Sequence, residues 1–141
     1  MATEETNAIT IKATVTAPIA KVWEFWNNPE HIKEWAFASP DWHVPNAEND
    51  LRKDGKFSTT MAAKDGSISF DFSGTYTAVE EHKLIEYVLG DGRKVKILFE
   101  SNGDKTEVTE TFDPESTNPL EMQKSGWQAI LDNFKRHTEQ N

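Results

Sequence analysis

A single glutamate, Glu110, is predicted to lie on the apolar face of a strand. It alternates in phase with Val108 and Phe112, and a period of two places all three side chains on one face of a sheet. A buried carboxylate must be paired, hydrogen-bonded or neutral, because an isolated buried charge is too costly. Glu110 is therefore either a polar anchor or general base with a raised pKa, or a carboxylate near the strand end that reaches water. We favour the second interpretation.

Other groups that could do chemistry are few. The hydroxyls of Thr59, Tyr76 and Tyr87 also fall on the inward face and could orient a ligand, although buried hydroxyls usually bond to backbone. Asp41 and His43 could form an acid–base pair only if loop geometry brought them together. We therefore assign no catalytic residue.

The histidines do not form a recognisable metal motif. His31, His43, His82 and His137 lack a metal-ligand spacing such as HxxxH, and the sequence contains no cysteine. We expect neither a metal site nor a cofactor.

The predicted inner face is rich in aromatic rings. The strands contribute Phe57, Met61, Phe70, Phe72, Tyr76, Tyr87, Phe99 and Phe112, and the last helix contributes Trp127, Ile130, Leu131 and Phe134. Each ring alone could simply fill a core. Together they favour a cavity, because ligand pockets are apolar and aromatic with few polar groups.

Three further rings, Trp35, Phe37 and Trp42, stand among Ser, Pro, Asp and Asn in a stretch that cannot be one regular element. Leaving such rings exposed would forgo roughly 1.5 to 3 kcal/mol of burial each. We expect them to cover the open end of the cavity; the alternative is that they only complete the core.

Strands are indicated by alternation and by turn dipeptides. Residues 67–79 alternate most clearly, and Asp65-Gly66, Asp91-Gly92 and Asn102-Gly103 have the composition of hairpin turns. We expect six strands and a seventh, weaker one near residues 42–46.

Two short helices are predicted after the first strand. Pro18 suits a first helical position and precedes apolar residues at helical spacing. Asn28-Pro29 should end that helix and cap a second one that runs to about Glu34.

A long helix is predicted at the C-terminus. Asn118 as N-cap, Pro119 at the first position and Glu121 as N3 partner resemble a capping box, and an apolar stripe runs from Leu120 to Phe134. Gly126 inside this helix costs roughly 1 kcal/mol relative to alanine. We therefore expect a strand, a helix or a ligand to approach the backbone there.

These elements predict an α+β helix-grip fold, in which a curved antiparallel sheet of six or seven strands wraps around the C-terminal helix. The sequence also resembles the START/Bet v 1-like superfamily, in the branch named after the activator of the heat-shock protein 90 ATPase. The resemblance is carried by "APIAKVWEFWNNPEHIKEW", "DGSISFDFSGTY" and "MQKSGWQAILDNFK". It covers nearly the whole chain and implies one domain over residues 1–141, with residues 1–7 a flexible N-terminus.

The resemblance implies a function in binding. Members of the superfamily typically hold an apolar or amphipathic small molecule between the sheet and the long helix. Eukaryotic activators carry an additional chaperone-binding domain for which this chain has no room, so co-chaperone activity is not expected. Two alternatives stay open: a cyclase- or hydrolase-type enzyme using Glu110 or the Asp41–His43 pair, and a chaperone-interaction domain.

Charge and composition limit the other partners. The net charge is −9, with 15 basic residues set among 24 acidic ones, which argues against nucleic acid. No apolar run approaches a membrane span, and the N-terminus lacks a signal sequence. We expect a cytoplasmic monomer or weak homodimer.

Overall fold

The computed structural model describes residues 8–141, and the flexible N-terminus expected for residues 1–7 lies outside this range. In the described residues, seven strands form one antiparallel sheet in the order β1-β7-β6-β5-β4-β3-β2. The strands are β1 (Ile9–Val15), β2 (Trp42–Asn49), β3 (Lys56–Ala63), β4 (Ser69–Glu80), β5 (Leu84–Leu89), β6 (Lys94–Asn102) and β7 (Lys105–Phe112). The helices are α1 (Ile19–Asn27), α2 (Pro29–Trp35) and α3 (Leu120–Gln140).

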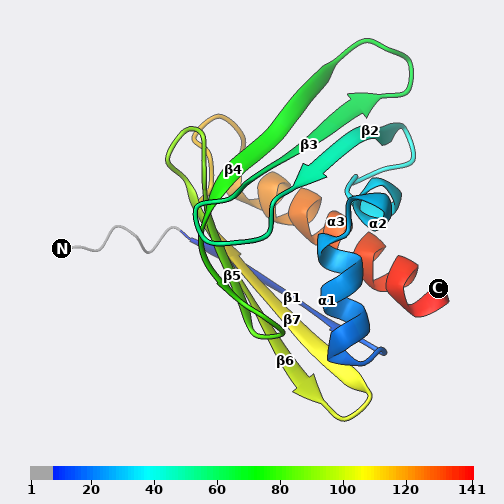
Figure 1. Ribbon diagram of the computed structural model, residues 1–141. Helices are drawn as coiled ribbons and strands as arrows, with labels where there is room; N and C mark the ends of the chain where they lie inside the picture. Colours follow the sequence, from blue (N-terminus) through cyan, green and yellow to red (C-terminus); the bar gives the residue numbers. More distant parts are fainter. Residues whose placement is uncertain (1–7) are drawn as a thin grey trace.

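The sheet curls around α3, which lies in its concave side between two arms (Figure 1). One arm ends in β1, which packs against α3, and the other ends in β2, which packs against α2. Helices α1 and α2 lie near the C-terminal half of α3 and close that side of the concave space (Figure 1). The predicted α+β helix-grip fold is confirmed.

The local signals for strands were accurate. The three turn dipeptides join β3 to β4, β5 to β6 and β6 to β7, and Gly92, for example, adopts a φ of 94° that favours glycine. The seventh strand is β2, which is longer than the prediction near residues 42–46. Its pairing with β3 shifts between His43 and Asn46, around Pro45, which has no N–H to donate and is tolerated on an edge strand.

Two helix starts differ from prediction. Pro18 is the N-cap of α1 rather than its first residue, and Pro119 is the N-cap of α3, with no side-chain cap. The capping box is wrong because Asn118 uses its side-chain amide to donate to Glu115 Oε2. The predicted cap of α2 is confirmed, since Asn28 Oδ1 accepts from the Glu30 backbone N–H at 2.9 Å.

The structure also bears on two predictions about α3: the inward position of Leu120 is wrong, and of the three groups expected to approach Gly126 only a ligand stays a prediction. Leu120 is 50% exposed, and the inward position of the first turns is taken by the buried Gln123. Around Gly126, an added Cβ would meet no atom within 4 Å, so no strand or helix approaches the backbone there. The stripe that α3 turns inward therefore starts at Gln123 and runs through Trp127 to Phe134.

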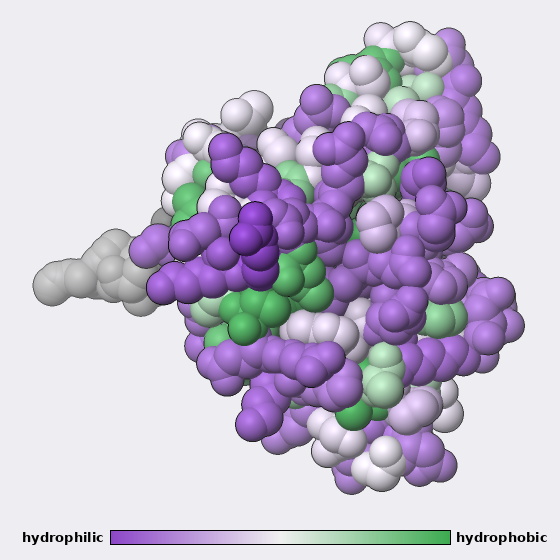
Figure 2. Space-filling view, viewed as in Figure 1, coloured by the Kyte–Doolittle hydropathy of each residue, from purple (hydrophilic) through white to green (hydrophobic). Residues whose placement is uncertain are grey.

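The composition is rich in charged residues, and the surface is correspondingly hydrophilic. The face seen in Figure 1 is mostly hydrophilic, with one compact hydrophobic area near its centre (Figure 2). No helix of residues 8–141 is long and apolar enough to span a membrane.

Candidate ligand-binding pocket

A cavity of about 350 Å³ lies between the concave face of the sheet and α3. Most of the residues predicted for the site line it: Trp35, Phe57, Met61, Phe70, Phe72, Tyr76, Tyr87, Glu110, Trp127, Ile130 and Leu131. Thr59, the inward-facing hydroxyl, lines it as well. Whether these residues bind a ligand stays a prediction.

Aromatic rings from β3, β4 and β5 form one wall of the pocket. Phe57 lies with its ring centroid 4.7 Å from that of Tyr87 and 5.2 Å from that of Tyr76. Phe72 meets Trp127 of α3 edge-to-face at 5.8 Å. Edge-to-face contacts of this kind hold the rings in fixed orientations, so this wall is shaped before any ligand arrives.

Two predicted site residues lie behind the wall instead of in it. Phe112 is fully buried and stacks on Trp127, with centroids 3.8 Å apart and planes inclined by 8°. Phe99 packs edge-on against Trp23 and Trp26 of α1, at 5.2 and 5.7 Å. Both rings face inward as predicted, but neighbouring aromatic side chains separate them from the cavity.

The rings of residues 35–42 do not act together as a cover. Trp35 lines the pocket and is fixed by its Nε1–H, which donates to the Phe25 carbonyl at 3.0 Å. Phe37 packs against the core, and its carbonyl accepts from Asn133 Nδ2 at 3.0 Å. Trp42 contacts Phe70 at 5.9 Å and does not reach the pocket. The predicted cover is therefore wrong for Phe37 and Trp42.

Glu110 is the polar side chain on the wall formed by β7. It pairs with Ile11 of β1 and Ile97 of β6, so the sheet flanks it on both sides, and it is only 6% exposed. Burial raises the pKa of Glu110 to about 8, with no compensating hydrogen bond or charge from the described residues. The interpretation that we favoured, a carboxylate reaching water at a strand end, is wrong.

The tyrosines differ in their partners. Tyr76 Oη donates to Asn49 Oδ1 at 2.5 Å, and burial raises its pKa further above the ordinary range. Tyr87 is buried, and its pKa is raised first by burial and then by the negative charge of Glu110. Tyr87 and Glu110 thus line one pocket, and an ionised Glu110 opposes the ionisation of Tyr87.

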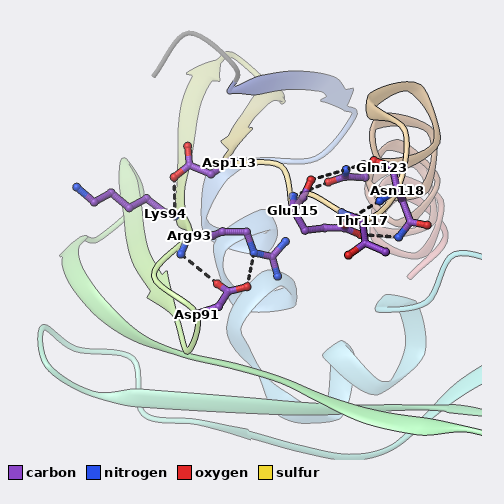
Figure 3. A network of polar contacts seen from close by, with 8 residues as sticks. All are labelled: Asp91, Arg93, Lys94, Asp113, Glu115, Thr117, Asn118 and Gln123. Carbon is purple, nitrogen blue, oxygen red and sulfur yellow. Dashed lines mark hydrogen bonds and ion pairs between the residues drawn. The ribbon is translucent and has the colours of Figure 1, made fainter. Parts of the chain in front are cut away.

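Sequence reasoning missed the polar end of the pocket, which consists of Arg93, Glu115 and Gln123 (Figure 3). Arg93 is held by Asp91, whose Oδ2 accepts from Nε at 2.7 Å. Gln123 Nε2 donates to the carbonyls of Glu115 and Asn118 at 3.0 and 2.8 Å, and its Oε1 accepts from the Glu115 N–H at 2.8 Å. Gln123 lies four positions before Trp127, and this helical spacing was the signal that could have placed Gln123 on the inward face.

Sequence reasoning also missed several pocket residues of α1, α2, β2 and β5. They are Trp26, Asn27, Ile32, Ala36, Glu48, Asn49 and Ile85. The apolar spacing of the first two helices was recognised, but it does not say which of their residues meet a cavity.

The remaining candidates for chemistry lie outside the pocket. Asp41 and His43 are both exposed and do not line it. His31 and His137 come together from α2 and α3, with Nδ1 and Nε2 3.1 Å apart, although 106 positions separate them in the chain. No group of three or more potential metal ligands occurs within residues 8–141.

Residues 16–139 match the family described as "Activator of Hsp90 ATPase homolog 1-like protein". The chain belongs to this family. An AHSA1-like protein from Aeromonas hydrophila, solved in solution, is 46% identical; the match covers 94% of this chain and 92% of that one, with a TM-score of 0.89. A solution structure from Cytophaga hutchinsonii is 61% identical over 96% of this chain and 94% of that one, with a TM-score of 0.83.

More distant structures share the fold alone. A protein from Nitrosomonas europaea is 19% identical, with 98% of this chain and 97% of that one covered and a TM-score of 0.82. No curated protein matches the chain. The predicted resemblance to the AHSA1-like branch and its START/Bet v 1-like fold is confirmed.

Proposed function

We propose that this AHSA1-like protein binds a small apolar or amphipathic molecule, aromatic or lipid-like, between the sheet and α3. The observation that carries the proposal is the cavity of about 350 Å³, whose wall combines aromatic rings with a small number of polar groups. Pockets for small organic molecules range from about 300 to about 1,000 Å³ and have the same composition. The volume lies at the lower end of that range, which favours a compact ligand over a long acyl chain.

The wall is also preorganised for binding. Phe57, Phe72 and Trp127 are fixed by ring contacts, and Trp35 by a hydrogen bond. Rings that are already ordered lose little conformational entropy when a ligand packs against them. A ligand therefore binds mainly through a shape that matches the pocket and through the apolar area that it buries there.

A thermal-shift screen of aromatic and lipid-like compounds tests the proposal. A ligand at about 100 times its dissociation constant should stabilise the native state by about 2.7 kcal/mol, because it binds the folded chain alone. Each hit should also change tryptophan emission in a saturable way. If no compound of a broad apolar set does either, the cavity is only a packing defect.

Two matched variants locate the binding. Trp127 lines the cavity, whereas Trp42 lies on the edge strand β2 and does not. Trp127→Phe should reduce the emission change, the rest of which comes from Trp26 and Trp35 in the same lining, and Trp42→Phe should leave it intact. The opposite result would place the ligand outside the pocket.

The second candidate is an enzyme of the cyclase or hydrolase kind that uses the same pocket. It is favoured by Glu110, because a carboxyl with a pKa of about 8 is suited to general acid–base chemistry near neutral pH. Product analysis of each hit after incubation with the protein tests it. If every compound is recovered unchanged, binding without catalysis is the function that remains.

A further inference from the structure

Glu110 is a buried polar side chain for which the fold provides no partner. Its exposed fraction is only 6%, and it lines the pocket from a position two residues before the end of β7. A buried polar group without a hydrogen-bond partner is costly, so such a group either bonds within the protein or bonds to a ligand. The apolar neighbours Ile11 and Ile97 in the adjacent strands cannot supply the bond.

We infer that Glu110 acts as a neutral carboxylic acid that donates a hydrogen bond to an uncharged carbonyl oxygen of the ligand. This inference rests on the proposed function and names its ligand class: a compact, neutral aromatic carbonyl compound. The apolar body packs against the ring wall, and the carbonyl oxygen meets the Glu110 carboxyl.

The protonation state supports the donor role. Burial raises the pKa of Glu110 to about 8, so the carboxyl is mostly protonated at neutral pH and carries an O–H that can donate. A carbonyl oxygen accepts that bond and leaves the pocket without net charge. The ligand class therefore matches the resting state of the site.

Charged ligands fit the site less well. A neutral amine would have to take the proton from Glu110, or an ammonium ion would require Glu110 to release its proton to solvent, and in either case two opposite charges would then lie out of water. The desolvation of a buried pair can exceed its Coulombic gain. A carboxylate would be desolvated against the same wall of rings and would lie in a pocket that also holds Glu48 and Glu115, while the positive charge of Arg93 at the polar end is already paired with Asp91.

Four probes with one naphthalene body test the inference. They are 2-acetylnaphthalene as the ketone, 2-isopropenylnaphthalene as the hydrocarbon, 1-(2-naphthyl)ethylamine as the amine and 2-naphthoate as the anion. At neutral pH the ketone should bind about tenfold more tightly than the hydrocarbon, which corresponds to about 1.4 kcal/mol. Equal binding of ketone and hydrocarbon, or tighter binding of the amine or the anion, would overturn the inference.

The ratio of ketone to hydrocarbon affinity should fall as pH rises through about 8, because the ionised carboxylate cannot donate. The other titratable or charged side chains that line the pocket are Glu48 of β2, Tyr76 of β4, Tyr87 of β5, Arg93 before β6 and Glu115 before α3. The pKa values of both tyrosines are raised and that of Glu115 is lowered, so the tyrosines stay neutral and Glu115 stays ionised through the same range. A ratio that rises with pH would indicate an ion pair instead.

Two substitutions at Glu110 distinguish a role as hydrogen-bond donor from a role as negative charge. Glu110→Gln keeps an N–H donor, so it should retain the ketone preference and remove its pH dependence. Glu110→Leu removes the donor and should abolish the preference. Glu107→Gln makes the same chemical change on the outer face of β7, beyond the pocket lining, and should behave as the wild type.

The outcomes distinguish this inference from the proposed function. If none of the four probes binds the wild type or Glu110→Leu, the inferred ligand class is rejected, whereas the proposed function is rejected only if the broad thermal-shift screen also finds no ligand. If the hydrocarbon binds and the ketone gains nothing over it, the pocket binds apolar molecules and only the role of Glu110 is rejected. Circular dichroism of each variant confirms that it is folded.

Discussion

Trp127 of α3 and Phe112 of β7 stack face to face, with ring centroids 3.8 Å apart and planes inclined by 8°. Phe112 has no exposed surface, whereas Trp127 turns its other side to the pocket. The stack therefore joins the long helix to the sheet and sets the position of a pocket ring.

The first prediction concerns this stack. Phe112→Ala should lower the free energy of unfolding by about 3 to 5 kcal/mol, because it leaves a cavity beneath Trp127. Urea unfolding measures the change. Phe70→Ala is the control, since Phe70 is 48% exposed and should cost far less. Similar losses in the two variants would mean that the stack contributes little.

The second prediction concerns Gly126, around which the structure leaves open space. Gly126→Ala should raise the free energy of unfolding by about 0.5 to 1 kcal/mol, because alanine has the higher helix propensity and restricts the unfolded chain. Thermal unfolding measures the gain.

Gly74 is the matched control for Gly126. A Cβ at Gly74 would lie 2.7 Å from the Val88 carbonyl oxygen and 3.0 Å from the Phe57 ring. Gly74→Ala should therefore destabilise the protein. A loss of stability in Gly126→Ala would mean that another group occupies the open space.

The fold was predictable because its signals are local. Alternation in β4 predicts which side chains face inward as far as Tyr76, beyond which the pairing with β5 shifts, and hairpin dipeptides such as Asp91-Gly92 predict which strands are neighbours. The helix starts were less predictable, because Asn118 had a competing partner in Glu115, and loop geometry decides such a competition.

The sequence predicts which face of the sheet carries the site, but not which residues of that face line the pocket. Phe99 and Tyr87 both point inward, but the sheet's curvature directs Phe99 to α1 and Tyr87 to the pocket. Arg93 reaches the pocket because Asp91 holds its side chain. Sheet curvature and turn conformation come from the whole fold, so a single sequence without its structure could not rank these residues.

The third prediction concerns Gln123, which closes the polar end of the pocket through bonds to Glu115 and Asn118. Gln123→Ala should cost about 1 to 3 kcal/mol, because three hydrogen bonds to partly buried backbone groups are lost. Urea unfolding measures the loss, with Gln128→Ala as the control, because the bonds of Gln128 Nε2 to the Lys12 carbonyl and Asp132 Oδ1 are open to solvent. Equal losses would show that water replaces the Gln123 bonds without penalty.

The fourth prediction is a pH dependence of stability caused by Glu110. Its pKa is about 8 in the folded chain, against an ordinary value of 4.5 that applies when the chain unfolds. Between these values the folded state holds the proton and the unfolded state does not, so the folded state binds more protons. Stability must then fall as pH rises through this window, and the contribution is fully present only below the lower value.

Glu110→Gln removes this titration and supplies the comparison. Relative to the variant, the wild type should lose more than about 1.4 kcal/mol, the equivalent of one pKa unit, between about pH 5.5 and about pH 8.5. Urea unfolding of both proteins at each pH measures the difference, and other titrating groups cancel because they are common to both. Glu107→Gln should follow the wild type throughout. Parallel curves for wild type and Glu110→Gln would mean that Glu110 is already ionised in the folded chain, and the donor role inferred for it would be lost as well.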